Sequence, residues 1–514
     1  MPDTGVINAD ILDPINNPAS NTFFNLAGTD IDFKADNLSF IGVDDVGYKR
    51  NDSWPEWAFM TASVTGKMEF ENCHWSGAAG IGYYLNSSPD KLDLILKDCQ
   101  ADGGDNGMEV LLNWYGDNEE DLLYMENCHF KNIGQEEAWS FNAKNRGVIY
   151  VRPWKSHKAV GCTFENILDR WQDYDGGGSD RIHTFKGSRQ SFEDCVFLAN
   201  GKNTLYAYYG SRTAPLTEFN RCKFKGINGG NIFIGIAARS TSKIHNCQFG
   251  PGVSIPIFTQ SNNNVWTEET FIDVDRCIFH SGGIEIYPNS PPVAPVHINI
   301  RNSEFPLDTN YTDGQRIKIH PGGNKAKVLL ENLVFKDTNT NSGSIIFFEG
   351  GASADIIARN CYFGYNDGAN QVEIVKQLRG TSTVTFIDCE VPDTITPRFT
   401  IDPYSGESGA KLYGRNNRFS NYSINNNPGN PAQAFDCYQI GTHTGVTDVN
   451  GEISVTLNQS CDFDWADIQI IGNNDFHADV ISIDSSALNI RIKDDTGANV
   501  SSTSVQFNYT INKK

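Results

Sequence analysis

Three aspartates in a glycine-rich segment are the residues of this chain best suited to acid–base chemistry. Asp173 and Asp175 stand two residues apart, and Asp180 follows the stretch Gly-Gly-Gly-Ser. On an extended strand, residues two apart point to the same side, with about 7 Å between their Cα atoms. Glycosidic bonds are cleaved by carboxyl pairs roughly 5 to 9.5 Å apart. We therefore predict Asp173, Asp175 and Asp180 as catalytic carboxylates, one acting as general acid and another as base or nucleophile.

Aromatic residues suited to holding a sugar ring occur on both sides of these acids. Trp139 precedes them, and Tyr206 and Tyr208 follow them, at matching places of the repeat described below. Because an aromatic face packs well against a sugar ring, we predict these residues to bind substrate. Phe233 and Phe258 stand at the same place in later units. They favour an alternative in which this position forms an inward aromatic stack and the aspartates only begin a solvated loop.

A second patch combines cationic and aromatic side chains. Tyr150, Arg152 and Trp154 alternate along one stretch and so share a face of a strand, as do Arg181 and His183 later in the chain. A polysaccharide lyase needs cations that neutralise a uronate and a His or Tyr base, because an enolate-like charge must be stabilised. We predict these residues as substrate-binding. The alternative is an exposed edge with surface ion pairs.

The elements that must position these residues follow from a phrase repeated along most of the chain. The phrase is Asn/Asp-Cys-x-Phe, as in Asn246-Cys247-Gln248-Phe249. With the Cys position as anchor, it gives about 14 units of about 29 residues, a period typical of solenoids. The anchors are Leu38, Cys73, Cys99, Cys128, Cys162, Cys195, Cys222, Cys247, Cys277, Ser303, Leu333, Cys361, Cys389 and Asn417.

Each unit is predicted to consist of strands. The anchor and the aromatic residue are two apart and point inward together, while the residue between them, such as Gln248, points out. One strand cannot use about 29 residues, so each turn must hold two or three strands. We expect an all-β fold, a right-handed parallel β-helix of about 14 coils followed by a small antiparallel β-sandwich.

The cysteines fit a buried ladder better than a disulfide framework. All of them except Cys437 and Cys461 occupy the anchor position. A free Cys behaves as a small buried hydrophobe, which suits an interior stack. We expect the ladder cysteines to be reduced and structural, and the sequence does not decide whether Cys437 and Cys461 pair.

Three parts are expected along the chain. Residues 1–66 are predicted as an N-terminal cap or attachment segment with the first coil, and residues 67–424 as the β-helix. Asn, Pro and Gly make the stretch 425–431 a linker by composition. Residues 432–514 are predicted as the sandwich, which would serve trimerisation or receptor binding, with a type I′ hairpin at Asn450-Gly451.

Composition argues against several function classes. The formal net charge is −22, whereas nucleic-acid binding requires clustered Lys and Arg. There is no apolar run of about 18 residues for membrane insertion. The first residues lack the basic and apolar regions of a secretion signal. Neither CxxC nor EF-hand spacing occurs, so we expect no metal and no cofactor.

Two motifs near the C-terminus resemble those of the C-terminal domain of many bacteriophage tailspikes and tail fibres. They are Thr447-Asp448-x-Asn450-Gly451-x-Ile453 and Ile483-Asp484-x-Ser486-x-x-x-x-x-Ile492-x-Asp494-x-x-Gly497. The β-helix part resembles the pectate-lyase-like group in architecture. The resemblance implies a virion protein that forms a homotrimer, joins phage tail or baseplate proteins through its N-terminus, and binds and often cleaves a host surface glycan.

Three interpretations of function therefore remain open. The first is a tailspike or tail fibre that recognises host surface polysaccharide, with or without cleavage. The second is a polysaccharide lyase or glycoside hydrolase acting alone. The third is a structural, adhesive fibre without catalytic activity. Oligomeric state separates the first two, and depolymerisation of host polysaccharide separates the first from the third.

Overall fold

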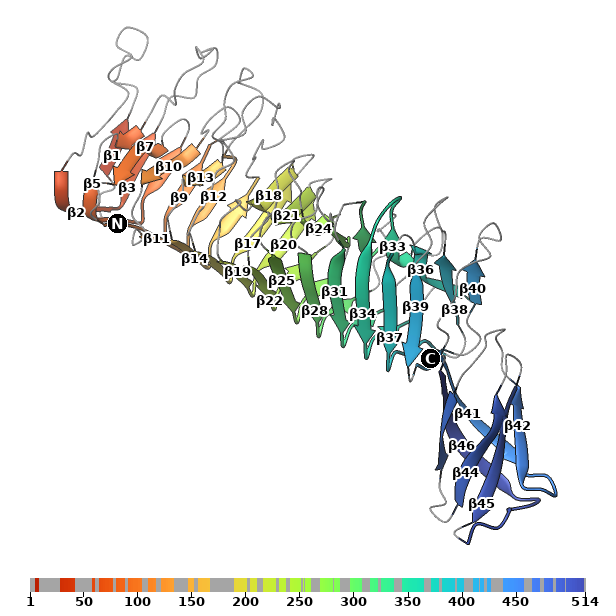
Figure 1. Cartoon of the computed structure of the whole chain (residues 1–514). Coiled ribbons are helices and arrows are strands. Elements are labelled where there is room, and N and C mark those ends of the chain that lie inside the picture. The colour runs from red at the N-terminus through yellow and green to blue at the C-terminus, as the bar shows by residue number, and fades with distance from the viewer. Residues whose placement is uncertain are drawn as a thin grey trace.

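The computed structural model consists of β-strands and their connections wherever it describes the chain (Figure 1). It describes residues 5–8, 28–41, 58–60, 64–76, 80–87, 91–103, 110–116, 122–133, 147–151, 156–166, 189–200, 204–209, 216–227, 231–236, 241–250, 253, 255–259, 269–280, 282–286, 296–306, 315–321, 325–336, 344–364, 371–378, 381–392, 395–401, 410–415, 417–419, 423–426, 438–456, 465–471, 476–483, 487–494 and 496–512.

The body of the molecule is a parallel β-helix, because each strand pairs in parallel with a strand from the next coil. Sheet I is the longest face, with 14 strands, each of which precedes one anchor of the repeat. Its strands are β2 (Gly28–Asp36), β5 (Val64–Glu71), β8 (Leu92–Lys97), β11 (Leu122–Glu126), β14 (Ser156–Val160), β16 (Arg189–Glu193), β19 (Leu216–Asn220), β22 (Thr241–His245), β25 (Thr270–Asp275), β28 (Val296–Arg301), β31 (Ala326–Glu331), β34 (Ala354–Arg359), β37 (Thr383–Ile387) and β39 (Lys411–Arg415).

Sheet II has 13 strands, and each of them except β1 begins at or directly after an anchor. Its strands are β1 (Gly5–Asn8), β3 (Leu38–Ile41), β6 (His74–Ser76), β9 (Gln100–Asp102), β12 (His129–Lys131), β15 (Thr163–Glu165), β17 (Val196–Asn200), β20 (Lys223–Ile227), β23 (Gln248–Phe249), β26 (Ile278–Phe279), β29 (Glu304–Phe305), β32 (Val334–Phe335) and β35 (Tyr362–Phe363).

The third strand of the coil belongs to one of two further sheets. Sheet III has nine strands and sheet IV, nearer the N-terminus, has four. The strands of sheet III are β18 (Thr204–Tyr209), β21 (Asn231–Ile236), β24 (Ile255–Thr259), β27 (Ile284–Ile286), β30 (Ile317–Ile319), β33 (Ser344–Phe348), β36 (Gln371–Leu378), β38 (Thr396–Ile401) and β40 (Ser423–Asn426). Those of sheet IV are β4 (Ala58–Met60), β7 (Gly80–Ser87), β10 (Val110–Gly116) and β13 (Gly147–Val151).

The residue before each anchor makes the sharp turn from sheet I to sheet II. In most coils it is Asn or Asp with a positive φ, such as 56° at Asn246. Asn and Asp adopt this left-handed conformation at lower cost than other residues with a Cβ. The turn explains the first half of the repeated phrase, and it directs the following Cys into the interior.

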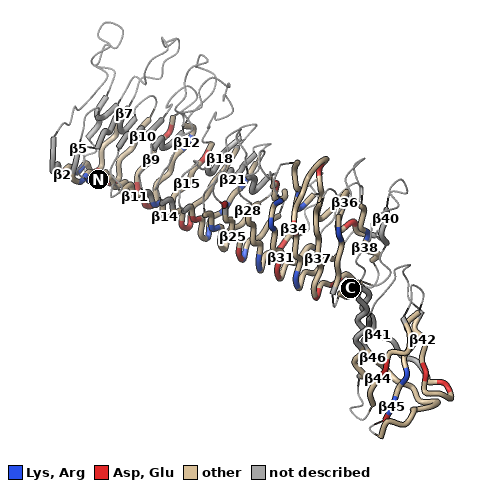
Figure 2. Tube along the Cα trace, in the orientation of Figure 1, with Lys and Arg blue, Asp and Glu red and all other residues tan. Residues whose placement is uncertain are grey.

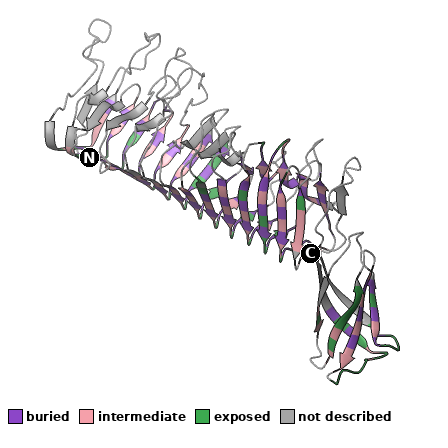
Figure 3. Cartoon of the chain, in the orientation of Figure 1, coloured by how far each residue is buried: buried purple, intermediate pink, exposed green. Residues whose placement is uncertain are grey.

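The interior contains the two ladders that the sequence predicts, and buried residues recur along the strands of successive coils (Figure 3). The ladder cysteines are all buried and free of disulfides, and each thiol contacts a backbone carbonyl, as Cys222 does with Phe192 at 3.4 Å. Burial raises the pKa of the Cys247 thiol well above its ordinary value. Ring centroids stack 4.6 Å apart between Phe305 and Phe335 and 4.8 Å apart between Phe249 and Phe279. The parallel β-helix is therefore confirmed.

Two antiparallel sheets of three strands each follow the last coil, as predicted for the C-terminal sandwich. Ile453, Leu488, Ile490 and Phe507 lie in its own apolar core. One sheet contains β41 (Tyr438–Val446), β46 (Ser504–Asn512) and β43 (Trp465–Ile471), and the other contains β42 (Glu452–Thr456), β45 (Ala487–Asp494) and β44 (Phe476–Ile483).

The hairpin predicted at Asn450-Gly451 is wrong. β41 pairs with β46, whereas β42 pairs with β45, so the turn between β41 and β42 crosses from one sheet to the other. Only Gly451 has a positive φ there, 75°, whereas a type I′ turn needs two such residues. A Cβ on Gly451 would lie 3.0 Å from the Ile492 carbonyl oxygen, so the crossing turn also packs against β45.

The predicted part boundaries remain proposals. The coil anchored at Leu38 already belongs to sheets I and II, through β2 and β3. Asn425 and Asn426 of the predicted linker lie in β40. The rest of that linker, together with Cys437 and Cys461, lies outside the described residues.

Candidate functional site

Most of the site residues predicted from sequence lie outside the described part of the chain. This applies to the proposed catalytic acids and to the cationic patch. The residues concerned are Trp139, Arg152, Trp154, Asp173, Asp175, Asp180, Arg181 and His183. Their roles stay predictions.

The three remaining predicted residues lie on strands of the third face. Tyr150 lies in β13 and pairs with Asn113 of β10. Tyr206 and Tyr208 lie in β18, where a register irregularity separates them, and they pair with the consecutive residues Phe233 and Ile234 of β21. Tyr206 and Tyr208 are two residues apart in β18, but their partners in β21 are only one residue apart. The alternation of a regular strand therefore cannot be used to place both tyrosines on one face.

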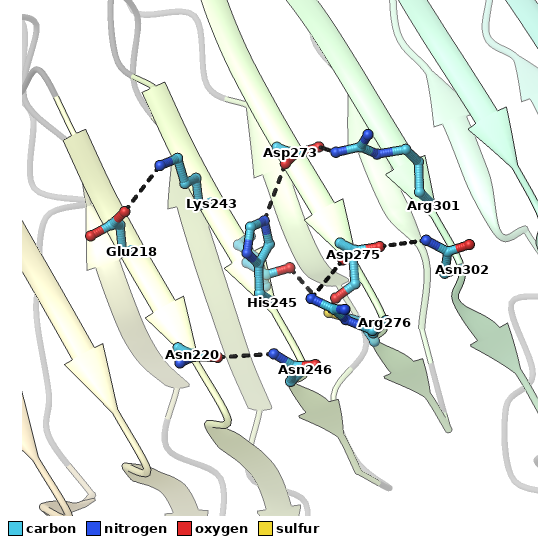
Figure 4. Close-up of polar contacts among 12 residues, drawn as sticks. Glu218, Asn220, Lys243, His245, Asn246, Asp273, Asp275, Arg276, Arg301 and Asn302 are labelled. Carbon is cyan, nitrogen blue, oxygen red and sulfur yellow. Dashed lines mark hydrogen bonds and ion pairs between the residues drawn. The ribbon is translucent and has the colours of Figure 1, made fainter.

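The outer face of sheet I carries a ladder of polar contacts between neighbouring coils (Figure 4). Lys243 binds Glu218 on the preceding coil at 3.2 Å. Oδ2 of Asp273 lies 3.1 Å from His245 Nε2 on the preceding coil. Oδ1 of Asp273 accepts a hydrogen bond of 2.7 Å from Arg301 Nη2 on the following coil. Charges of both signs are interspersed along the middle strands of the β-helix (Figure 2). Because these charges pair with one another, we interpret this face as one that holds the coils together and not as a site.

Arg221 is a variation on this ladder, since it replaces the usual Asn before the anchor. Its Nε donates to Asp194 at 2.8 Å, and its Nη2 donates to Glu193 at 2.6 Å. These hydrogen bonds lower the pKa of both carboxyls, and Lys158 adds to the effect on Glu193. The pair of coils is held by a bidentate guanidinium contact.

A different arrangement occurs where three successive strands of sheet III end. Glu285 lies in β27, His320 directly follows β30, and Glu349 directly follows β33. The backbone N–H of His320 donates to the Ile286 carbonyl, and that of Glu349 donates to the Ile319 carbonyl, each at 2.8 Å. Continued strand pairing thus brings together three residues that are far apart in sequence, the Glu–His–Glu cluster (Glu285, His320 and Glu349).

Close backbone approach fixes the register beneath this cluster. A Cβ on Gly283 would lie 2.4 Å from the Gln315 carbonyl oxygen. Glycine at position 283 therefore allows the backbone of the following coil to approach this closely. The buried Arg316 donates to the Gly282 carbonyl at 2.9 Å, and its guanidinium lies 6.0 Å from the centre of the Phe305 ring. These contacts hold β30 against β27 and therefore hold His320 against Glu285.

Both ring nitrogens of His320 contact carboxylates. Nε2 lies 2.8 Å from Glu285 Oε2, and Nδ1 contacts Glu349 Oε2. The side chain of His320 is only 6% exposed, that of Glu285 18% and that of Glu349 43%. Lys318 Nζ lies 3.9 Å from the same Glu349 oxygen. A buried imidazole is thereby connected to the surface through one glutamate.

The geometry suits proton transfer. Nε2 of His320 is hydrogen-bonded to Glu285 and Nδ1 lies against Glu349, so the imidazole bridges two carboxylates. Elsewhere in the described ranges, His129 and His245 each contact a carboxylate through Nε2 at 3.1 Å. The Glu–His–Glu cluster differs in having a carboxylate on each ring nitrogen, and it can hold a proton for a group that meets Glu349.

No periodic sequence signal marks this cluster, because its residues stand at different distances from their anchors. The connections between sheets II and III vary in length, so counting along the repeat does not align the three positions. In the described ranges, no group of three or more His, Cys, Asp or Glu is arranged to hold a metal ion. No helix there is long and apolar enough to cross a membrane.

These features define the chain as a parallel β-helix protein with a C-terminal antiparallel β-sandwich. No protein-family model matches it, and no curated protein matches it. Among solved structures it is similar to phage tailspikes. A mutant tailspike of E. coli bacteriophage HK620 is 12% identical with a TM-score of 0.38, over 95% of this chain and 87% of that one. Tailspike gp61 of Pseudomonas phage phi297 is 10% identical with a TM-score of 0.32, over 88% of this chain and 67% of that one.

Proposed function

We propose that this protein is a phage tailspike or tail fibre that recognises a polysaccharide on the host cell surface. The observation that carries the proposal is the long stack of coils in sheets I and II, which ends in a separate antiparallel sandwich. Strands in register about 4.8 Å apart repeat the same outward positions along the axis. On sheet II such a surface suits a linear polysaccharide, because one polymer can meet equivalent rows of side chains over many coils.

The turn motifs that resemble those of tailspikes support the proposal through their packing. The carboxylate of Asp448 accepts hydrogen bonds from the backbone N–H groups of Asn450 and Glu452, each at 2.8 Å. Asp494 accepts in the same way from Thr496 and Ala498. Both motifs are thus Asx-type turns in a sandwich that has its own core.

The proposal includes a homotrimer in the virion, attached to tail or baseplate proteins through the N-terminus. A trimer would place three copies of the same surface on one particle and raise the avidity for a repetitive glycan. Depolymerisation is a second candidate function, favoured by the Glu–His–Glu cluster, in which proton transfer to a bound glycan is chemically feasible.

A binding experiment over many bacterial strains tests recognition. The labelled full chain is applied to a panel of strains, before and after periodate oxidation or protease treatment of the cells. We expect at least one strain to bind, the binding to disappear after periodate, and purified polysaccharide from that strain to compete. Binding that survives periodate and disappears with protease would overturn the glycan proposal, as would a panel with no binding strain.

A further inference from the structure

A row of five outward positions, three on sheet II and two that continue it by single β-bridges, has the composition of a sugar-binding surface. The Tyr362 row consists of Glu304, Val334, Tyr362, Glu390 and Arg418. We propose that Tyr362 is the aromatic platform of this row and holds one ring of a hydroxyl-rich polysaccharide. The inference rests on the proposed function, because it names residues that would meet the polymer.

The register places the five residues side by side on successive coils. Glu304 pairs with Val334, and Val334 pairs with Tyr362. Two further parallel bridges join Tyr362 to Glu390 and Glu390 to Arg418. At about 4.8 Å per coil, the row runs roughly 19 Å along the axis of the β-helix. A polymer lying parallel to this axis would cross all five positions.

Tyr362 is both exposed and supported. The residue is 37% exposed. Its ring rests over Gly364, which directly follows β35, because a Cβ on that glycine would lie 2.4 Å from Tyr362 Cε1. Glycine is therefore the residue that allows the ring to lie against the backbone. A ring already held in place loses little conformational freedom when a ligand packs on its open side.

Charged groups stand at both ends of the Tyr362 row. Arg418 lies 3.9 Å from Glu390, with side chains 80% and 49% exposed. Glu304 is paired with Lys336 at 3.2 Å, and both are about half exposed. Ion pairs this exposed contribute little to stability, so they can exchange partners at low cost. Their carboxylates accept hydrogen bonds from sugar hydroxyls, and their cations donate to hydroxyl and ring oxygens.

The test uses two substitutions that disturb the platform in different ways. Tyr362→Ala removes the ring, and Gly364→Ala keeps the tyrosine but forces the ring off the backbone. The matched control is Phe271→Ala, which removes the aromatic ring of a residue that is 43% exposed on sheet I. The probe is polysaccharide purified from a strain that binds the parent chain, and melting temperature and oligomeric state are measured in parallel.

We expect Tyr362→Ala to weaken the affinity for this polysaccharide about fivefold to tenfold, and Gly364→Ala to weaken it in the same direction. Phe271→Ala should leave it unchanged. Parental affinity in Tyr362→Ala would overturn the inference while the proposed function stands. If Tyr362→Ala instead dissociates an oligomer, the row is a contact between copies and the inference is wrong. If no strain binds the parent, the proposed function fails first, and this inference with it.

Discussion

Asn360 Nδ2 donates a hydrogen bond of 2.8 Å to Oδ1 of Asn332, one coil earlier. Asn332 donates in turn to Asn302 at 2.9 Å. All three residues have φ close to 50°, in the left-handed region. One side chain therefore does two things, since it tolerates the turn conformation and ties each coil to its neighbour.

The two contributions of Asn332 can be separated by substitution. Asn332→Ala loses both inter-coil hydrogen bonds and also replaces Asn by a residue that adopts a φ of 54° less readily. We expect a loss of about 1 to 2 kcal/mol in the free energy of unfolding. Asn332→Gly loses the same hydrogen bonds but keeps the turn, so it should cost less. Denaturant unfolding of both variants measures the difference, and equal losses would exclude a backbone contribution.

Cys222 tests the interior ladder. Its thiol contacts the carbonyl oxygens of Phe192 at 3.4 Å and Asn220 at 3.5 Å and is fully buried. Cys222→Ala leaves a small cavity and should cost about 1 to 2 kcal/mol. Cys222→Gln places an unpaired amide in the stack and should cost several kcal/mol.

Thermal melts with and without dithiothreitol complete this test. Because the ladder thiols are free, reductant should leave the melting temperature of the parent unchanged. A large drop in dithiothreitol would mean that these cysteines are cross-linked in solution.

The body of the fold was predictable from sequence because its constraints are local and repeated. Each Asn-Cys-x-Phe phrase specifies a turn, an inward thiol and an inward ring within four residues, as at Asn246 to Phe249. Phe249 then stacks on Phe224 and Phe279 at 4.8 Å because every coil repeats the same positions. The period therefore determines the contacts between coils.

Features that depend on the length of connections were not predictable in this way. His320 meets Glu285 and Glu349 only because the third strands of three coils end side by side. The turn at Gly451 was predicted as a local hairpin, but its strands pair with distant partners. No periodic signal reports such pairings, because they depend on the lengths of connections and join strands that are distant in sequence.

The Asx-type turns of the sandwich predict a dependence of stability on pH. Hydrogen bonds, chiefly from the Glu452 backbone N–H, lower the pKa of Asp448, and those from Thr496 lower the pKa of Asp494. A lowered folded-state pKa means that the unfolded chain binds the proton more tightly. The stabilisation is thus complete above the ordinary value of 3.8 and is lost as the pH falls through the lower folded-state values.

Melting of Asp448→Asn and Asp494→Asn between pH 6 and pH 2 measures this dependence. The variants should melt below the parent at pH 6 and show a smaller further decrease in acid. Val449→Ala is the control, since that side chain is 82% exposed in the same turn. A parent whose sandwich melts at the same temperature from pH 6 to pH 2 would contradict the assignment.

Deletion of residues 432–514 tests the proposed trimer. The sandwich and the β-helix have separate apolar cores, so the coils should remain folded without the sandwich. We expect light scattering to find a trimer for the full chain and fewer trimers for the shortened one, because parallel solenoids need a device that sets the register between copies. A monomeric full-length chain would refute the trimer and favour an enzyme that acts alone.

The acids predicted from sequence are the subject of the last prediction. If one of Asp173 and Asp175 acts as general acid and the other as base or nucleophile, Asp173→Asn and Asp175→Asn should abolish release of oligosaccharides and leave binding intact. Asp180→Asn tests the third acid. Tyr206→Ala and Tyr208→Ala should instead weaken binding, by roughly 1 kcal/mol or more each, through lost ring contact. Reducing ends are counted after incubation with polysaccharide from a strain that binds the parent.

Glu349→Gln makes this experiment decisive, because it removes the exposed acid of the Glu–His–Glu cluster. Glu218→Gln is its matched control, since Glu218 pairs with Lys243 on the outer face of sheet I. If the aspartate variants digest as fast as the parent and Glu349→Gln does not, the general acid is Glu349 and the sequence-based site is wrong. If the parent binds the polysaccharide but never releases oligosaccharides, neither site is catalytic. The protein is then a binding fibre, and its carboxylates serve only recognition and the cohesion of the coils.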